Sequence, residues 1–229
     1  MTPAPILKHF DFDPCWVLHQ DDWILVVNKP SGLLSVPGRG ADKQLSMTTL
    51  LQAAFGDIHV VHRLDMDTSG VMVFARDKES HRHLSRQFQE RETAKRYHAL
   101  CAGHLQSHQG RCCLPMRCDW ERRPLQMIDP VHGKYAETEF VLDQQFSEYF
   151  SIWLHPITGR SHQLRLHMKM QGHPILGDNL YADPISLKMA SRLCLHAQML
   201  AFCHPHTEQT LRFETDSRFF DPLNGINTA

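Results

Sequence analysis

Short apolar runs separated by turn-forming residues are the dominant pattern of this chain. Nine such runs alternate with clusters of Asp, Asn, Gly and Pro, and each has the length of a strand. They are Trp16–Leu18, Trp23–Val27, Ile58–Val61, Val71–Ala75, Tyr97–Ala102, Glu137–Leu142, Phe150–Leu154, Leu195–Phe202 and Leu211–Phe213. Two segments have the apolar i, i+4 spacing of an amphipathic helix, Lys78–Glu90 and Ser161–Met170. The pattern predicts an α+β fold with a mixed or mostly antiparallel central sheet and flanking helices.

Local signals set the limits of these elements. Asp21-Asp22 predicts a hairpin turn between the first two strands. Ser161 is the expected N-cap of the second helix, and Gly172 is its expected stop. The stretch from Gly110 to Tyr135 is rich in Arg, Pro, Cys and Gly, so we expect an irregular insertion there.

Composition bounds the class of protein. With 42% hydrophobic and 21% charged residues, the chain is too apolar for wholesale disorder. It has no repeat and no Gly/Ser linker, so we expect one continuous folded body. No apolar run approaches the roughly 20 residues of a membrane span. Seven cysteines without a secretion signal are typical of a reducing compartment, so we expect a cytoplasmic protein that does not bind membranes.

Charge is balanced overall but separated along the chain. The 24 Lys and Arg residues against 25 Asp and Glu residues give a net charge of -1. Basic side chains exceed acidic ones by three between Arg76 and Arg96, and the stretch from Tyr149 to Gly177 has no acidic residue. This pattern fits either one positive cleft or separate solvated faces.

The densest cluster of reactive side chains lies between two predicted strands, at His62–Gly70. A loop between strands is where a scaffold displays catalytic groups, but Asp, Thr, Ser and Gly also form ordinary turns. Both interpretations stay open on the residues alone. The roles of Arg165 and Tyr97 are equally open, because Arg165 fits an exposed helix face and Tyr97 fits an ordinary strand position.

Five stretches of the sequence resemble the motifs of the RluA family of pseudouridine synthases, over about Trp16 to Phe213. The matching stretches are His62–Gly70, Lys95–Ala99, Ile157–His167, Asn28–Leu33, and Gly172–Asp178 followed by Tyr181. The resemblance implies the pseudouridine synthase fold, with a catalytic cleft in one domain over 16–215. This leaves an N-terminal extension over 1–15 and a C-terminal tail over 216–229. The resemblance also implies an isomerase that acts on uridine in structured RNA without a cofactor or metal.

The branch of the family is suggested by two features. The sequence has no room before Trp16 for an S4 RNA-binding module, and Cys118–Pro124 is similar to the insertion of the short type. That type acts on large-subunit ribosomal RNA and on the anticodon stem-loop of transfer RNA, so these are the expected partners of a monomeric enzyme. Leu125 and Met127 depart from the pattern, because the short type has basic residues there.

Three catalytic roles follow from the resemblance. Forming pseudouridine breaks the N1–C1′ bond, turns the uracil and re-bonds it through C5. A carboxylate can attack C1′ or stabilise positive charge on the ribose, a role implied for Asp65. Arg165 is its implied partner, because a cation offsets the cost of burying a carboxylate. Tyr97 is implied to lie against the uracil. A covalent ester, a glycal and a base adduct all remain open as intermediates.

RNA contacts are implied for a second set of residues. The target base must leave its stack, at a cost of a few kcal/mol, and Arg63 is the implied group that fills the vacancy. The other candidates for RNA binding are His62, Arg39, Arg82, Arg86, Arg123 and Arg160.

Two other classes of function are weighed against this one. A non-catalytic RNA-binding or RNA-folding module could keep the same fold. A metal-dependent hydrolase could use the seventeen histidines, for example Cys194 and His196 with Cys203, His204 and His206. Their spacing matches no standard zinc framework, and Asp67 falls at a variable position of the family signature, so no metal site is predicted.

Overall fold

The structure of the chain is a computed structural model that describes residues 10–217, 220–221 and 225–226. The chain forms two compact units. Unit 1 comprises the described residues up to Ala94 together with Met199–Thr215, and unit 2 comprises Lys95–Gln198 and the described residues from Asp216 on. Residues 1–9 of the expected N-terminal extension lie outside the described residues, as does much of the expected tail. The division at residues 15 and 215 stays a prediction.

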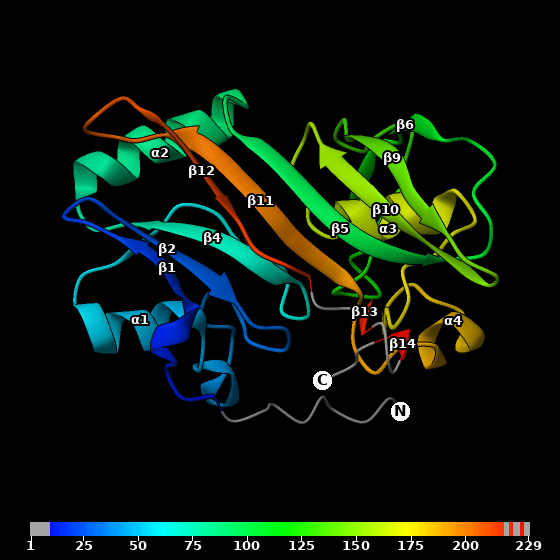
Figure 1. The fold of residues 1–229 in the computed structure, drawn as a ribbon, viewed down its shortest axis with the longest axis horizontal. Helices are drawn as coiled ribbons and strands as arrows, with labels where there is room; N and C mark the ends of the chain where they lie inside the picture. The colour runs from blue at the N-terminus through cyan, green and yellow to red at the C-terminus, as the bar shows by residue number, and fades with distance from the viewer. Residues whose placement is uncertain (1–9, 218–219, 222–224, 227–229) are drawn as a thin grey trace. The chain divides into compact units, whose positions relative to one another are not determined.

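Unit 1 is an antiparallel sheet with two helices (Figure 1). Its elements are η1 (Pro14–Trp16), β1 (Val17–Gln20), β2 (Ile24–Lys29), η2 (Ala41–Lys43), α1 (Met47–Phe55), β3 (His59–Val60), β4 (Ser69–Ala75), α2 (Lys78–Glu90), β11 (Leu195–Cys203, from Met199 on) and β12 (Thr210–Glu214). β2 pairs with β1 and β4, β3 pairs with β4, and β12 pairs with β11. The predicted turn at Asp21-Asp22 is confirmed, because the Asp21 N–H donates to the Ile24 carbonyl at 3.1 Å.

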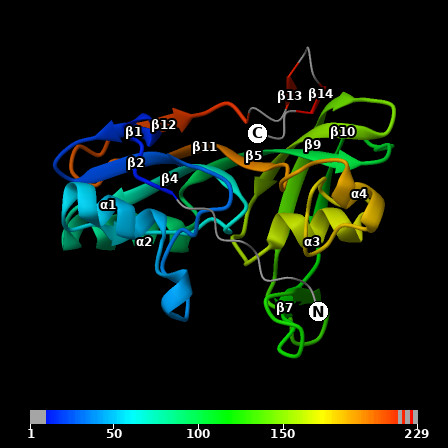
Figure 2. The same cartoon turned by 90° about the horizontal axis from the view of Figure 1, so that it is seen from below.

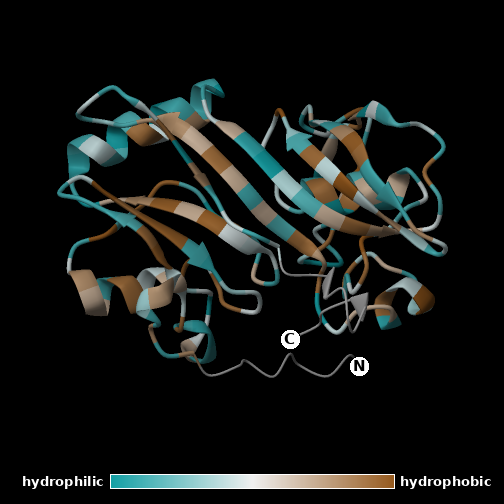
Figure 3. Ribbon diagram, in the orientation of Figure 1, coloured by the Kyte–Doolittle hydropathy of each residue, from teal (hydrophilic) through white to brown (hydrophobic). Residues whose placement is uncertain are grey.

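One part of the core of unit 1 lies between its sheet and α2. Val26 of β2 and Val73 of β4 are fully buried and pack with Leu84 of α2, while Phe88 adds to the same cluster. The remainder of α2 is largely hydrophilic (Figure 3). Its spacing predicted this helix because one turn separates the two apolar residues that meet the sheet.

The ends of both helices in unit 1 are set by side-chain caps. Asp77 caps α2 by accepting from the backbone N–H groups of Glu79 and Ser80 at 2.8 and 2.9 Å. α1 was not predicted, and it begins at a capping box between Ser46 and Thr49. A Thr at this position is a weaker sequence signal than the usual Glu or Gln.

Unit 2 is a second antiparallel sheet with two further helices (Figures 1 and 2). Its elements are β5 (Ala94–Ala102, from Lys95 on), β6 (Gln109–Cys113), β7 (Met116–Cys118), β8 (Gln126–Ile128), β9 (Glu137–Gln145), β10 (Tyr149–Pro156), α3 (Gln163–Met170), α4 (Pro184–Lys188), the first part of β11, and the pair β13 (Phe220–Asp221) and β14 (Gly225–Ile226). The strands follow the order β5-β10-β9-β6, and β7 and β8 form a separate hairpin.

The core of unit 2 lies between this sheet and α3. Leu164 and Met168 of α3 pack against Ala99 of β5 and against Ile152 and Leu154 of β10. β5 changes along its length from hydrophilic to hydrophobic (Figure 3), and its burial increases in the same direction. The end of β5 therefore belongs to the core, while its start carries polar side chains.

Two expectations about unit 2 are wrong. The stretch Gly110–Tyr135 is not irregular, because it holds most of β6 together with the β7–β8 hairpin. Ser161 is not the N-cap of α3. His162 takes that place with φ +55°, and Gln163 organises the start of the helix by accepting from the Arg160 N–H at 3.0 Å and from the Thr158 hydroxyl at 2.7 Å.

The remaining expectations about secondary structure agree with the structure. Each of the nine predicted strands is present, with limits that differ by a few residues, and α2 has the predicted limits. Gly172 ends α3 as expected, with φ +85° and its N–H on the Lys169 carbonyl. Among the described residues, no helix combines the length and apolar character of a membrane span.

The cap of α2 supports a stability prediction. Partial burial alone would raise the pKa of Asp77, but the hydrogen bonds from Ser80 and Glu79 outweigh it and hold the pKa below its ordinary 3.8. Asp77→Ala is expected to lower the free energy of unfolding in urea by about 1 kcal/mol at pH 7. A lowered pKa stabilises the fold above the ordinary value, so the difference from wild type should shrink as the pH falls below 3.8.

The exposed carboxylate Asp57 provides the control for this measurement, since it follows α1 and caps no helix. Asp57→Ala is expected to change the free energy of unfolding by less than about 0.5 kcal/mol. An equal loss in both variants would show that charge, and not the cap, accounts for the effect.

Candidate active site

The cluster His62–Gly70 forms a tight loop after β3 and the first two residues of β4 in unit 1. Asp65 is half-buried in this loop, and Leu64 before it and Thr68 after it are buried. The Thr68 N–H donates to the Asp65 carbonyl at 3.2 Å, which closes a turn around the two residues between them. Asp65 is therefore held at both sides by buried neighbours.

A buried lysine holds this loop in place. Lys29, the last residue of β2, is fully buried, and its ammonium group donates to three carbonyls. The acceptors are those of Pro30, Leu33 and Met66, at 2.8, 2.7 and 2.9 Å. Because Met66 directly follows Asp65, the ammonium group joins the turn after β2 to the Asp65 loop.

Four further hydrogen bonds join the same two segments. Gly32 donates its N–H to the Met66 carbonyl at 2.9 Å. Ser31 donates its hydroxyl to the Asp67 carbonyl at 2.7 Å. Ser35 donates its hydroxyl to the Leu64 carbonyl at 2.7 Å and accepts from the Leu64 N–H at 3.1 Å. The turn after β2 thus fixes the backbone on both sides of Asp65.

His62 has a structural role in unit 1. Its ring stacks on Phe88 of α2, with centroids 4.5 Å apart and planes 16° apart. Its Nε2 accepts from the Val73 N–H at 3.1 Å, so this nitrogen carries no proton. These contacts tie the start of the loop to β4 and to α2. Arg63, the next residue, is exposed.

The other predicted RNA-binding residues of unit 1 are exposed cations. Arg39 lies in the turn before η2, while Arg82 and Arg86 lie one turn apart on the exposed side of α2. Arg82 is 3.8 Å from Glu79, and both side chains are more than 80% exposed. A pair this exposed contributes little to stability, so Arg82 remains available to another anion.

Arg165 is held by a buried ion pair in unit 2. It lies on α3 with 2% of its surface exposed, and its Nε and Nη2 donate to the two carboxylate oxygens of Asp178 at 2.9 and 2.6 Å. Nη2 also lies 3.2 Å from Oδ1 of Asn179. Asp178 is fully buried and accepts in addition from two backbone N–H groups of the loop after it. The plane of the guanidinium group is therefore fixed.

Tyr181 connects Arg165 to neighbouring elements. Its ring lies 5.4 Å from the guanidinium carbon of Arg165 and 5.7 Å from Nζ of Lys169. Its hydroxyl oxygen is 2.8 Å from Nδ1 of His162 and accepts from the backbone N–H of Gln126 in β8 at 2.8 Å. One phenol thus joins the start of α3, the loop of Asp178 and the β7–β8 hairpin.

Tyr97 lies in the polar first half of β5, opposite Leu154 of β10. It is half-buried and packs against the hydrophobic core of unit 2. Packing on one side leaves the other part of the ring accessible, which fits a residue that is to lie against a base.

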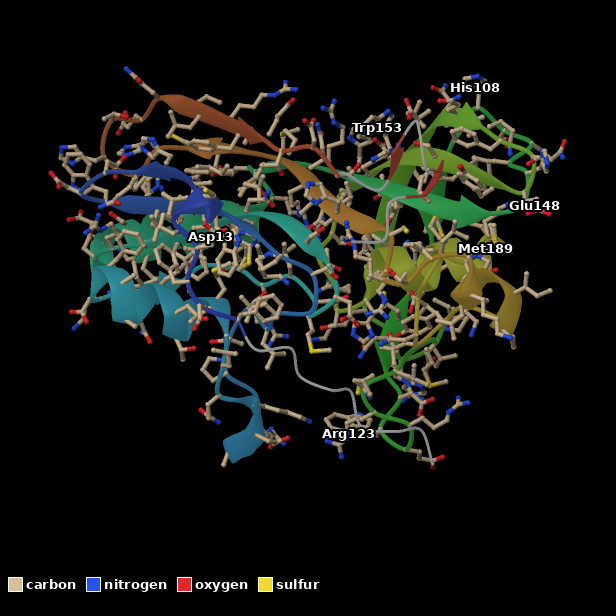
Figure 4. The ribbon with its side chains drawn as sticks, turned by 60° about the horizontal axis from the view of Figure 1, so that its bottom comes forward. Asp13, His108, Arg123, Glu148, Trp153 and Met189 are labelled. Atoms are coloured by element: carbon tan, nitrogen blue, oxygen red, sulfur yellow. The ribbon has the colours of Figure 1, made fainter. Side chains whose placement is uncertain are left out.

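Arg160 and Arg123 lie in two loops of unit 2. Arg160 precedes α3 and donates from Nε to the Tyr135 carbonyl at 3.1 Å. Arg123 lies at the far end of the β7–β8 hairpin (Figure 4), where its guanidinium carbon is 4.7 Å from the ring of the exposed Trp120. Leu125, near the tip of this hairpin, packs into the cluster of Met116, Ala136 and Tyr181.

The predicted site residues divide between the two units. Asp65 shares unit 1 with Arg63, His62, Arg39, Arg82 and Arg86, whereas Arg165, Tyr97, Arg123 and Arg160 belong to unit 2. The convergence of Asp65 with Arg165 and Tyr97 would join the units, and it stays a prediction.

Lys29, Asp178 and Tyr181 were not predicted as site residues. All three lie in matched family stretches, so a buried Lys after a strand and an Asp-x-x-Tyr loop were the available signals.

No group of three or more metal-binding side chains capable of holding an ion is present in the part of the chain that the structure describes. His204, one of the residues considered for zinc, is occupied by other bonds. Its Nδ1 accepts from the N–H groups of His206 and Thr207 at 3.2 and 3.0 Å, and its Nε2 lies 3.1 Å from Asp21.

Comparison with known proteins places the chain in a family. The sequence profile of RNA pseudouridylate synthase matches residues 23–170. The chain belongs to the RNA pseudouridylate synthase family. It is 50% identical over 204 residues to a Haemophilus influenzae protein named dual-specificity RNA pseudouridine synthase RluA, covering 89% of this chain and 93% of that protein. A Yersinia pestis protein of the same name is also 50% identical, over 89% of this chain and 99% of its own length.

Solved structures agree with the assignment of this chain to the family. Human RNA pseudouridylate synthase domain containing 1 superposes with a TM-score of 0.76 at 28% identity, covering 93% of this chain and 88% of that one. Human RNA pseudouridylate synthase domain containing 4 gives a TM-score of 0.68 at 27% identity, covering 87% of each chain. The predicted fold and enzyme class, an isomerase acting on RNA, are confirmed.

The buried ammonium group of Lys29 generates a prediction for unit 1. Lys29→Met keeps the apolar stem but leaves the carbonyls of Pro30, Leu33 and Met66 without this donor. We expect the free energy of unfolding to fall by about 3 kcal/mol or more, because each lost bond involves a charged donor. Thermal unfolding measures the loss, with Lys43→Met at the exposed η2 as the control. A loss below about 1 kcal/mol would contradict the anchoring role.

The buried pair in unit 2 generates a second prediction. Asp178→Asn keeps the shape of the side chain but leaves the Arg165 charge without its carboxylate. Breaking a buried pair in this way costs about 3–5 kcal/mol, so a large drop in the urea midpoint is expected. Asp183→Asn, in the exposed cap of α4, is the matched control. Equal midpoints for the Asp178 variant and wild type would show that the pair does not stabilise unit 2.

Proposed function

We propose that this enzyme isomerises uridine to pseudouridine in large-subunit ribosomal RNA, in the anticodon stem-loop of transfer RNA, or in both, with Asp65 as the catalytic carboxylate. The observation that carries the proposal is the family match over residues 23–170, which includes Asp65, Tyr97 and Arg165. The names of the relatives, which specify dual specificity, support two classes of RNA. The enzyme is proposed to act as a cytoplasmic monomer.

The proposed reaction conserves every atom of the uridine. The N1–C1′ bond breaks, the uracil turns within the site, and C5 bonds to C1′. The proton on C5 is lost and N1 gains one, so the step needs a group that handles charge at C1′ and a proton acceptor near C5. A carboxylate can do both, and a rigid loop around Asp65 keeps it at one distance from the ribose.

Arg165 is proposed to hold Asp65 in its ionised form. The bidentate bond to Asp178 fixes the guanidinium group through Nε and Nη2. A fixed cation costs no reorganisation when charge develops in the transition state.

The remaining residues are proposed to bind and open the RNA. Tyr97 lies against the uracil, with the other face of its ring on the protein core. Arg63, exposed two residues before Asp65, fills the place of the extruded base. Phosphate contacts are assigned to five arginines, Arg39, Arg82, Arg86, Arg123 and Arg160. His62 supports the Asp65 loop by stacking on Phe88.

The test is the release of tritium from RNA labelled at uracil C5. Asp65→Asn is expected to reduce release by roughly 10²–10⁴-fold or more, because the carboxylate acts on the reacting atoms. The dissociation constant for RNA should change by less than about threefold, since the amide keeps the shape of the side chain. Asp67→Asn in the same turn is the matched control and is expected to keep turnover.

Each other result has a defined meaning. Turnover near the wild-type rate in Asp65→Asn would overturn its catalytic role. RNA binding without release by wild type would indicate a non-catalytic RNA-binding protein. Release that EDTA abolishes would indicate a metal-dependent reaction. Unmodified ribosomal and transfer RNA, assayed separately, identify the substrate class.

A further inference from the structure

Tyr135 is an exposed aromatic side chain that the proposed mechanism does not use. It lies between β8 and β9 in unit 2, and 48% of its surface is accessible. Single exposed apolar side chains are common on protein surfaces and by themselves indicate no function. Tyr135, however, is unusually well fixed for an exposed side chain.

The phenol end of the ring is held by a carboxylate. The Tyr135 hydroxyl donates a short hydrogen bond to Glu137. Glu137 is itself largely buried and pairs with Nη1 of Arg111 at 3.0 Å. Glu137 raises the pKa of Tyr135 to about 12, so the phenol stays protonated and keeps donating. The ring therefore cannot rotate away without losing this bond.

The backbone end is held by the elements that carry Arg165. Ala136, the next residue, is fully buried in one cluster with Leu166 of α3 and with Tyr181, which lies against Arg165. The Tyr135 carbonyl accepts from Nε of Arg160 at 3.1 Å. Tyr135 is thus fixed at both ends, beside a cation and next to the start of α3.

We infer that the exposed face of Tyr135 is a stacking surface for a nucleobase of the RNA that flanks the target uridine, with Arg160 contacting the adjoining phosphate. The inference rests on the proposed function and adds a binding residue to it. Every base has a π face, so stacking on a ring is tolerant of sequence, while a neighbouring cation binds the backbone. A ring that is already ordered loses little conformational entropy on binding.

Alternative occupants fit the surroundings less well. A protein partner would need an apolar area much larger than one ring, and the neighbours of Tyr135 are the charged residues Lys134, Glu137 and Arg160. A base together with its phosphate needs one flat apolar face and one positive charge, which this position offers.

The test measures binding of the stem-loop RNA, from transfer or ribosomal RNA, on which the wild-type enzyme releases tritium. Tyr135→Ala is expected to weaken binding roughly tenfold, because it removes the stacking ring. Tyr135→Phe removes the bond to Glu137 but keeps the ring, and it should restore most of the lost affinity. Ile185→Ala, which removes an exposed apolar side chain from α4 in the same unit, is the control and should bind as wild type.

Salt dependence separates stacking from charge. The plot of the logarithm of the association constant against the logarithm of the salt concentration has a negative slope. Arg160→Ala is expected to reduce the magnitude of this slope by about one, because one phosphate contact is lost. Tyr135→Ala should weaken binding with the slope unchanged. RNA carrying 2-aminopurine at positions beside the target uridine provides a direct readout, since stacking quenches its fluorescence. At one of these positions, the 2-aminopurine fluorescence of the complex should be lower for wild type and Tyr135→Phe than for Tyr135→Ala.

Two outcomes would overturn the inference. Equal affinity of Tyr135→Ala and wild type would show that the ring does not contact RNA. A loss in Tyr135→Phe as large as that in Tyr135→Ala, with no change in 2-aminopurine fluorescence, would show that the residue acts only through Glu137. Tritium release by wild type in either case leaves the proposed function intact, whereas absence of release in wild type refutes that function itself.

Discussion

The burial of one ammonium group determines the architecture around Asp65. A charge removed from water is stable only when every proton finds an acceptor, and Lys29 meets that requirement with three backbone carbonyls. Carbonyls can point at a lysine only where the chain leaves regular structure, because in a strand they bond to neighbouring strands. The turn after β2 and the loop after Leu64 are therefore irregular for the same reason. Their irregularity is what sets Asp65 outside the sheet.

Unit 2 solves the same problem with an ion pair. Arg165 is as buried as Lys29, but its bidentate geometry calls for a carboxylate, and Asp178 supplies both oxygens at 2.9 and 2.6 Å. Asp178 in turn orders its own loop by accepting from the N–H groups of Leu180 and Tyr181. In each unit, a buried cation limits the conformational freedom of a loop. A buried pair specifies geometry more than it adds stability, which suits a loop that must present one arrangement of donors.

How well the sequence predicts a feature depends on how far apart in the chain the residues that determine it lie. Strands such as β4 were predictable because apolar runs between turn residues depend on neighbours in the chain. α1 was missed because its capping box uses Thr49 in place of an acidic residue. Ser161 was a wrong N-cap because the Gln163 side chain accepts from the Arg160 N–H, and that side chain is held by bonds to the distant residues Glu137 and Thr138. Asp65, Tyr97 and Arg165 were suggested by family motifs alone. The bonds of Lys29 to Met66 and of Arg165 to Asp178 could not be predicted, since each joins residues more than ten positions apart.

The two units differ in how they present positive charge. Arg82 and Arg86 stand on an exposed helix face, where screening by salt weakens them and long side chains keep their freedom. Such cations raise affinity for any RNA without fixing its register. Arg160 and Arg123 are different, because the Tyr135 carbonyl holds the first and the Trp120 ring lies against the second. A cation beside an exposed aromatic residue can combine a phosphate contact with a stacking face. We therefore propose that unit 2 discriminates among RNA loops, and that unit 1 provides the proposed catalytic Asp65 and general attraction for RNA.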